Sequence, residues 1–419
     1  MTNKEVNQPR STEPRFSYGH IVVGIAFLIM AVSWGLYSIF GIFLNPLLTE
    51  FGWTRAMTSG AFSLSLLLSG VIGIAMGELT DRFGPRLVVT LCGIFLGLGY
   101  LLMSQTSTLW QLYLFYGVII GFGVSGIWVP LLSSVARWFT RRRSLISGIV
   151  VSGGGIGGLA APLVISRLIA VYDWRITYAI QGVVILIVMI LGAQFLRRAP
   201  EPTGQLPHGE NEGKQQGLTP DTRSFSFREA IHTAQFWLLF FMFFCYGYCI
   251  FSIMVHIVPH IIDLEISAIG AANILAATGG VTVLGNFVLG GVGDRIGSRQ
   301  IFIFGFILMS AVMLWLTLAT EVWMFYLFAV AFGFALGGMA TSESPLIARL
   351  FGLRSHGLIF GVAGFGHVIG GAAGPVVTGY IFDLTLSYQI AFLICAAFGV
   401  TGLILTVALR PTKKIGLRL

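Results

Sequence analysis

GELTDRFGPR (residues 77–86) and GGVGDRIGSR (residues 290–299) are two copies of one pattern, a glycine-containing segment with an Asp-Arg pair at its centre. The copies lie 213 residues apart in a chain of 419. The same spacing separates three further pairs of landmarks: Pro46 and Pro259, Gly148 and Gly361, and Pro162 and Pro375. Four unrelated pairs at one offset indicate that the chain consists of two repeats in parallel order.

The composition indicates that both repeats lie in a membrane. Hydrophobic residues make up 56% of the chain and charged residues only 10%, whereas roughly a quarter of the residues of a soluble domain carry charge. The mean hydropathy of +0.86 is spread over almost the whole length, which excludes a soluble domain with a single anchor. The 54 glycines suit closely packed helices, and the alternating polarity of a transmembrane β-barrel is missing.

Apolar windows of about 20 residues predict an all-α membrane protein with twelve transmembrane helices. We place these helices at residues 18–45, 55–79, 87–106, 109–136, 144–170, 176–197, 233–262, 267–292, 300–319, 322–348, 357–382 and 388–409. A polar segment rich in proline and glycine interrupts them once. The expected organisation is a tail at 1–17, a six-helix bundle at 18–197, a linker at 198–232, a second bundle at 233–409 and a tail at 410–419.

The positions of the basic residues predict the orientation. Nearly all of the 25 lysines and arginines fall in the two tails, the central linker and the loops after the second, fourth, eighth and tenth helices. The opposite side has only Arg55, Arg167 and Arg175. Because lysine and arginine mark cytoplasmic loops, both termini are predicted to lie in the cytoplasm, with the chain in the cytoplasmic or plasma membrane. The net charge of +8 therefore indicates topology, and nucleic-acid binding is not expected.

In several short segments the chain resembles the major facilitator superfamily. These are the two Asp-Arg loops, the glycine-rich segment ending in Pro162 and the turn YDWR (172–175). EFGWTR (50–55) and ARWFTRRRSLISGIVVSGGGIGG (136–158) further resemble the branch of monocarboxylate porters and oxalate–formate antiporters. The resemblance implies a monomeric secondary transporter whose substrate site lies between the two bundles.

The resemblance also implies a gate at the cytoplasmic ends of the helices, where charge contacts break during transport. The candidate gating residues are Asp81 and Arg82 in the first loop, Asp294 and Arg295 in the second, and Arg137 and Arg349 across the gap. An acid beside a base at a helix end can pair with such partners. The alternative is that these residues only form tight cytoplasmic turns.

Glu343 is the most deeply placed acidic residue. It precedes Arg349 by six residues, which places it roughly 9 Å inside the end of its helix at ~1.5 Å per residue. An ionised carboxyl at that depth is costly, so it must be protonated, paired with a base or exposed to a water-filled cavity. We predict a role in proton coupling; the alternative is a structural ion pair with an arginine of the gate.

Histidines and aromatic residues supply further candidates for the substrate site. His367 falls near the middle of its helix and can bind substrate or carry a proton, and His260 shares a helix face with His256. Each ring could instead be a neutral, hydrogen-bonded core group. The aromatic candidates, any of which could serve packing alone, are Trp34, Tyr37, Tyr116, Trp128 and Tyr246.

Asn286 departs from the pattern of the resembled branch. It stands eight residues before Asp294, where porters of that branch commonly have an arginine that pairs with the substrate carboxylate. An amide donates hydrogen bonds but supplies no charge. We therefore expect a secondary transporter that moves a small organic solute, a monocarboxylate with protons, by alternating access. The alternative is an importer or exporter of a neutral or amphipathic compound, with Asn286 as a substrate contact.

Other classes of function are disfavoured. The chain has no nucleophile–base pair, metal cluster or nucleotide-binding loop, so an enzyme is not expected and neither a cofactor nor a metal is predicted. Cys92, Cys245, Cys249 and Cys395 all lie in apolar stretches and imply no disulfide or zinc framework.

Overall fold

A computed structural model describes residues 18–138, 143–197, 225–352 and 355–410, and every regular element in these ranges is helical. Twelve helical segments of the described residues are long and apolar enough to cross a membrane, as predicted. The predicted tails and most of the predicted linker lie outside the described residues, apart from Arg410.

The first six spans are built from ten helical elements. The first span joins α1 (Tyr18–Ser38) to α2 (Phe40–Phe51), and the fourth joins α5 (Leu109–Leu112), the π-helix η1 (Tyr113–Ile120), α6 (Gly121–Val124) and α7 (Trp128–Trp138). The other four spans are single helices: α3 (Arg55–Phe83), α4 (Pro85–Met103), α8 (Arg143–Tyr172) and α9 (Trp174–Phe195).

The last six spans are unbroken helices that follow the short helix α10 (Phe227–Ile231). They are α11 (Ala234–Asp263), α12 (Ala268–Ile296), α13 (Ser298–Leu316), α14 (Val322–Phe351), α15 (His356–Thr385) and α16 (Gln389–Ala408). The predicted bounds differ from these by a few residues, most at the first span, which continues to Phe51. Hydropathy marks the apolar stretch, whereas the helix continues through polar Thr49 and Glu50 until Gly52, whose left-handed φ of 65° ends it.

The two Asp-Arg patterns adopt the same local structure. Gly84 separates α3 from α4 with a φ of 88°, and Gly297 separates α12 from α13 with a φ of 103°. These values disfavour any residue with a Cβ atom, so each glycine permits two long helices to meet at a one-residue turn. The sequence repeat is therefore also a structural repeat.

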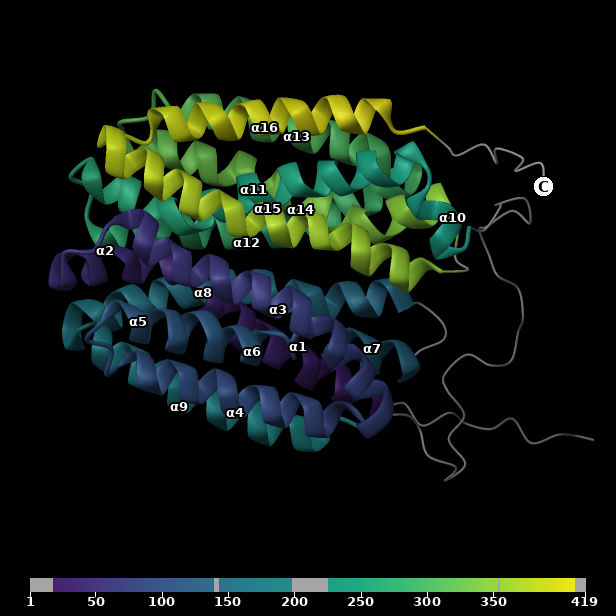
Figure 1. The fold of residues 1–419 in the computed structure, drawn as a ribbon, viewed down its shortest axis with the longest axis horizontal. Coiled ribbons are helices and arrows are strands. Elements are labelled where there is room, and N and C mark those ends of the chain that lie inside the picture. The colour runs from purple at the N-terminus through teal and green to yellow at the C-terminus, as the bar shows by residue number, and fades with distance from the viewer. Residues whose placement is uncertain (1–17, 139–142, 198–224, 353–354, 411–419) are drawn as a thin grey trace, which may run out of the picture.

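The two sets of six spans form two layers (Figure 1). Packing between the layers runs along α3 with α15, α8 with α12 and α2 with α11. Tyr18 and Arg410, the first and last described helix-end residues, lie at one end of the molecule, which we call the terminal face. The opposite end, where α2 meets α3 and α15 meets α16, is the distal face.

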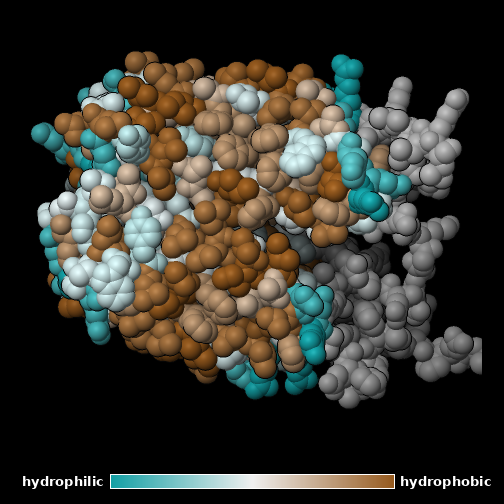
Figure 2. Space-filling view, in the orientation of Figure 1, coloured by the Kyte–Doolittle hydropathy of each residue, from teal (hydrophilic) through white to brown (hydrophobic). Residues whose placement is uncertain are grey.

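The surface between these two faces is apolar. Figure 2 shows that hydrophobic residues cover most of the middle of the face in view, with hydrophilic residues gathered toward its two ends. Large exposed side chains of the surface include Ile74, Leu284 and Phe287, each more than half exposed. Such a surface is stable only against lipid. With twelve apolar spans, the chain is an integral multi-pass membrane protein.

Glycines set the closest helix contacts. Gly35 on α1 and Gly157 on α8 face each other, and a Cβ atom on Gly157 would overlap the carbonyl of Ala31. Because lipid gives apolar helices no hydrophobic reason to associate, close backbone packing of this kind provides much of their attraction.

We predict that Gly157→Ala destabilises the protein, whereas Gly148→Ala on the same helix does not. A Cβ atom at position 148 meets no atom within 4 Å. Overpacking costs about 1–3 kcal/mol, while Ala is otherwise preferred over Gly in a helix. Thermal unfolding of both variants in one detergent provides the measurement. Equal melting temperatures for the two variants would contradict the assigned packing.

Candidate functional site

A cation at the start of α3 connects the two bundles at the distal face. Arg55 follows Thr54, whose side chain caps the helix by accepting a hydrogen bond from the Met57 amide. The Arg55 guanidinium donates to the Asp263 carboxylate at 2.8 Å and to the Tyr388 hydroxyl. The Arg55 side chain is only 11% exposed, whereas the Asp263 side chain is 33% exposed, so the pair lies at the protein surface with its cation largely covered. A charge from the first bundle is thus neutralised by the second.

The second bundle also caps the helix that carries Arg55. The Asp383 carboxylate accepts hydrogen bonds from the backbone amides of Arg55 and Ala56, both at 2.9 Å. An acid at a helix N-terminus satisfies free amides and interacts favourably with the helix dipole. Gly379, one turn before Asp383, permits the approach, since a Cβ atom there would lie 2.8 Å from the Ala56 nitrogen.

His256 of α11 extends this network into the protein. Its Nε2 lies 2.8 Å from the Pro375 carbonyl, which can only accept, and its Nδ1 lies 3.0 Å from the Tyr388 hydroxyl oxygen. The neutral ring therefore donates from Nε2 and accepts the Tyr388 proton at Nδ1. Burial raises the pKa of the Tyr388 phenol and outweighs the opposite effect of Arg55.

We call these residues the distal cluster: Arg55, His256, Asp263, Asp383 and Tyr388.

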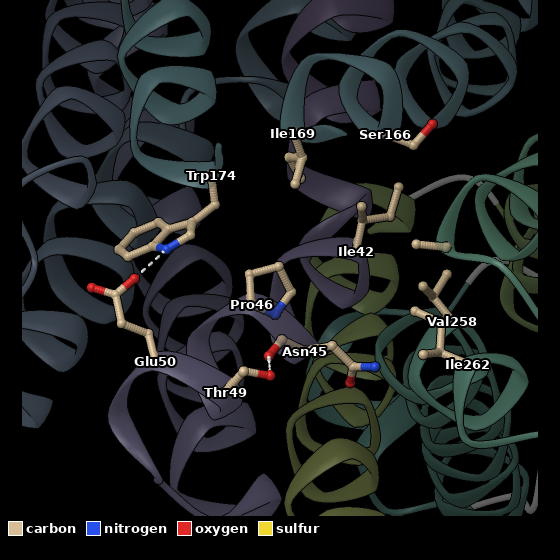
Figure 3. Close-up of a pocket in the computed structure, with 11 residues that line it drawn as sticks. Ile42, Asn45, Pro46, Thr49, Glu50, Ser166, Ile169, Trp174, Val258 and Ile262 are labelled. Carbon is tan, nitrogen blue, oxygen red and sulfur yellow. Dashed lines mark hydrogen bonds between the residues drawn. The ribbon is translucent and has the colours of Figure 1, made fainter. Parts of the chain in front are cut away.

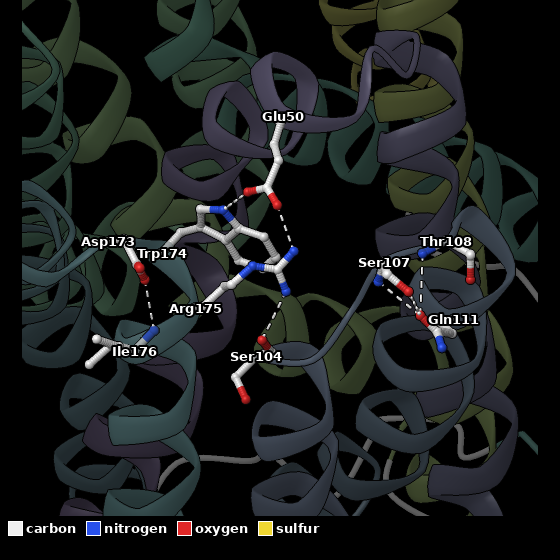
Figure 4. A network of polar contacts seen from close by, with 9 residues as sticks. All are labelled: Glu50, Ser104, Ser107, Thr108, Gln111, Asp173, Trp174, Arg175 and Ile176. Atoms are coloured by element: carbon white, nitrogen blue, oxygen red, sulfur yellow. Dashed lines mark hydrogen bonds and ion pairs between the residues drawn. The ribbon is translucent and has the colours of Figure 1, made fainter.

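A second polar network at the distal face stays within the first bundle (Figure 4). The Glu50 carboxylate accepts from the Arg175 guanidinium and from the Trp174 indole, both at 2.6 Å. Arg175 also donates to the Ser104 carbonyl at 3.0 Å. Asp173 caps α9 by accepting from the Ile176 amide. The turn YDWR thus joins the ends of α2, α4 and α9.

Three of the predicted site residues lie close together in the second bundle. The ring of Tyr246 on α11 lies 5.1 Å from that of His367 on α15, and its hydroxyl donates to the Leu336 carbonyl of α14. The backbone nitrogen of Asn286 on α12 lies against Gly337, the residue after Leu336 on α14. The Asn286 Oδ1 and the His367 Nδ1 are buried without a hydrogen-bond partner. Since buried polar atoms are normally paired, both atoms are available to a ligand or to water.

Glu343 lies about two helical turns beyond Leu336 toward the terminal face and is half-buried. No hydrogen bond or ion pair joins it to another residue in the described part of the chain. The structure therefore places Glu343 on the terminal-face side of Tyr246, Asn286 and His367, without a base as its partner.

The aromatic candidates of the first bundle fall into two groups. Tyr37 and Tyr116 are fully buried; the Tyr37 hydroxyl bonds to Ser65 at 2.8 Å, and Tyr116 donates to the Tyr37 carbonyl. Trp34 and Trp128 are half-buried, and their rings meet edge to face at 5.2 Å. The tyrosines therefore belong to the core, while the tryptophan pair keeps some exposed surface.

His260 lies apart from Asn286 and His367. Its ring is surrounded by those of Phe392 at 4.9 Å, Tyr388 at 5.3 Å and Phe325 at 5.7 Å, and its Nε2 is buried without a partner. This position is next to the distal cluster.

The structure describes the side chains of four of the six residues predicted to gate the terminal face. Arg82 is exposed and lies over the ring of Phe83, its neighbour in sequence. Arg295 is exposed, and Arg349 lies against the turn at Gly297 in its own bundle. Asp81 is exposed at the end of α3. The side chains of Arg137 and Asp294 lie outside the described residues.

Sequence reasoning missed most of the distal cluster. Arg55 was noted only as one of few bases on its side and as part of EFGWTR, and the roles of Asp263, Asp383 and Tyr388 were not identified. One signal was available, because Arg55 is one of only three basic residues expected on the distal side and would need a partner if it were buried. Which charges pair depends on how the bundles dock, and no local pattern encodes that.

Comparison with known proteins agrees with this architecture. The family model described as Major Facilitator Superfamily matches residues 25–283 and, in a second match, residues 258–418. Monocarboxylate transporter 13 of Bos taurus is 27% identical over 414 residues, which cover 94% of this chain and 89% of that protein. The uncharacterised MFS-type transporter YhjX of Escherichia coli (strain K12) is 27% identical over 321 residues, covering 75% of this chain and 76% of that protein.

A solved structure has the same fold. The crystal structure of a bacterial homologue of the human lysosomal transporter Spinster, in an inward-facing and occupied conformation, superimposes with a TM-score of 0.71 at 17% identity. The match covers 94% of this chain and 96% of that one. Together with the matches of the family model to both repeats, these findings show that the chain belongs to the major facilitator superfamily and is a membrane transporter, not an enzyme.

Proposed function

We propose that the chain moves a monocarboxylate together with protons by alternating access, with the terminal face in the cytoplasm. Similarity to monocarboxylate transporter 13 along almost the whole chain carries this proposal. Basic residues at the terminal-face ends of the helices, such as Arg82, Arg299 and Arg349, support the orientation.

The distal cluster serves as the outer gate in this proposal. The seams between the bundles are tight near the middle of the spans: a Cβ atom on Gly279 would overlap the backbone of Gly158, and one on Gly371 would lie 2.8 Å from Leu66. Toward the terminal face, a Cβ atom on Gly148 of α8 or Gly361 of α15 would meet no atom within 4 Å. These contacts, together with the distal cluster, support a conformer that is closed at the distal face and more open toward the terminal face.

Substrate binding is assigned to Asn286, Tyr246 and His367, with Trp34 and Trp128 as the facing aromatic wall. The unpartnered polar atoms of Asn286 and His367 support this assignment. Glu343 lies between this group and the terminal face, where a proton exchanges with the cytoplasm. A carboxyl without a basic partner is stable there only in its neutral form or hydrated, so binding and releasing a proton changes its charge.

A neutral or amphipathic substrate is the second candidate, and Asn286 favours it. In the described parts of the second bundle's spans, the basic residues Arg295, Arg299 and Arg349 all lie near the terminal-face ends. None is at the depth of Asn286, so a carboxylate there is bound by hydrogen bonds alone. Such bonds favour an anion less than a guanidinium does.

Uptake of radiolabelled monocarboxylates of two to six carbons into proteoliposomes tests the proposed function. We predict uptake when the outside is acidic relative to the lumen, and loss of uptake when the proton gradient is collapsed. Thermal stabilisation by neutral ligands, without uptake of any acid in this series, would instead support the second candidate.

We predict that Arg55→Gln opens the distal face, because the amide cannot neutralise Asp263 or stack on Phe382 as the guanidinium does at 3.7 Å. Spin labels at the exposed positions Val171 and Glu321 report the separation of the two bundles. Longer distances are expected in Arg55→Gln. Arg175→Gln is the matched control, since Arg175 pairs within one bundle. Unchanged distances in Arg55→Gln would remove the cluster's role as a gate.

A third prediction concerns proton coupling. Glu343→Gln keeps the shape of the side chain but cannot exchange a proton, so uptake driven by a pH gradient should be abolished while counterflow exchange of substrate persists. Glu78→Gln removes an exposed acid near the same face and serves as the control. If pH-driven uptake by Glu343→Gln equals that of the unsubstituted protein, Glu343 does not couple protons.

A further inference from the structure

A cavity of about 510 Å³ lies at the distal face between the two bundles (Figure 3). Its volume is in the range of pockets that hold small ligands. The first bundle contributes α2, the distal end of α8 and Trp174, and the second bundle contributes α11 and the start of α12. Residues that define its walls are Asn45, Pro46, Ser166, Val258, Ile262 and Ala268.

The cavity is separate from the candidate transport site. Gly41 lies one helical turn from Asn45 in the direction of Tyr37, and a Cβ atom on Gly41 would lie 2.8 Å from the Met254 carbonyl. This contact between α2 and α11 closes the cavity on the side of Tyr37. Thr49 and Glu50, by contrast, are exposed and lie at the distal end of the lining. The opening therefore faces the distal side.

Two polar atoms of the lining lack a partner in the protein. The Ser166 side chain is 5% exposed and its Oγ has no hydrogen bond, and the Asn45 Oδ1 is also buried and unpartnered. Figure 3 shows both residues beside the apolar Ile42, Val258 and Ile262. Because a buried unpaired oxygen is unfavourable, each would gain from a ligand that donates a hydrogen bond.

The charge of the lining indicates which ligands fit. Glu50 is the ionisable residue among the lining, and its carboxylate is already held by Arg175 and Trp174. The lining contains no lysine, arginine or histidine, so nothing in it would neutralise an anion. Most of the remaining wall is apolar. A molecule with a short apolar part and neutral hydroxyl or amide donors matches these walls.

We propose that this distal cavity is a second binding site, for a small neutral amphipathic molecule that bears hydrogen-bond donors, and that its occupation inhibits transport. The ligand contacts both bundles, and one cavity residue, Ile262, directly precedes the Asp263 that pairs with Arg55. Occupation adds contacts between the bundles that exist only while the distal face is closed. It therefore shifts the population toward that conformer, as a ligand selective for one state must.

Hexyl glucoside is a suitable probe, because it joins a short alkyl chain to an uncharged head with several hydroxyl donors. Binding to the protein in lipid nanodiscs is measured by calorimetry below the probe's micelle concentration, with hexanoate as an anionic probe of equal chain length. We expect saturable binding of the glucoside at one site and at least tenfold weaker binding of hexanoate to this site.

Substitutions of lining residues test whether the glucoside binds in the distal cavity. Ser166→Ala and Asn45→Leu each remove one acceptor at nearly constant volume and should weaken glucoside binding about five- to tenfold. Ala268→Phe fills the cavity from its exposed rim and should abolish binding, while the neighbouring Ile269→Phe, which does not line the cavity, should not. Asn286→Leu in the candidate transport site should leave this binding unchanged. Melting temperatures verify that each variant is folded.

Two outcomes would overturn the proposal: glucoside binding unaffected by Ala268→Phe and Ser166→Ala, or no saturable binding. Binding that Asn286→Leu alone removes would place the ligand in the transport site and also overturn it. The binding measurement does not use transport, so it stands even if monocarboxylate uptake fails. Inhibition is tested separately with whichever substrate is transported, by comparing Ala268→Phe and Ile269→Phe at a saturating glucoside concentration.

Discussion

The need to neutralise Arg55 governs how the two bundles meet. A largely buried guanidinium requires hydrogen-bonded partners, because an unpaired charge away from water is unfavourable. Here Asp263 and Tyr388 both come from the other bundle. The charge is therefore satisfied within the protein only while the distal face is closed. If the bundles part there, Arg55 and Asp263 both gain water, and this hydration offsets the lost pair. Such a contact can break and re-form reversibly.

The close contacts between the bundles lie near the middle of the spans. A Cβ atom on Gly279 would overlap the backbone of Gly158, and one on Gly371 would lie 2.8 Å from Leu66, whereas a Cβ atom on Gly148 of α8 or Gly361 of α15 would meet no atom within 4 Å. A rigid helix that is packed closely at its middle and less closely near one end can tilt about the packed part. Gly148 and Gly361 are one of the pairs at the 213-residue spacing, so equivalent positions of both bundles are left open on the same side.

The sequence was sufficient to predict the twelve spans and the repeat, because apolar length and the Asp-Arg turns are local properties. The grouping of Asn286 with His367 could be predicted only in part. The depth of a residue in the membrane can be counted along its helix, but the neighbour that its side chain faces depends on how the helices pack. Tyr37 and Tyr116 show this, since both were candidates for the cavity and both are buried in the core. The distal cluster was largely missed because its partners are brought together from positions up to 333 residues apart.

The repeat explains why Arg55 of the first bundle pairs with residues of the second bundle. At the 213-residue spacing, Glu50 corresponds to Asp263 and Arg175 corresponds to Tyr388. In the first bundle the acid and the base pair with each other. In the second bundle the base is replaced by a tyrosine, which leaves Asp263 without a cation of its own. Arg55 of the first bundle fills that place and also bonds to the substituting Tyr388. One divergence between the repeats thus converts a contact within a bundle into a contact between bundles, and a contact of this kind would have to break in the alternating access proposed above.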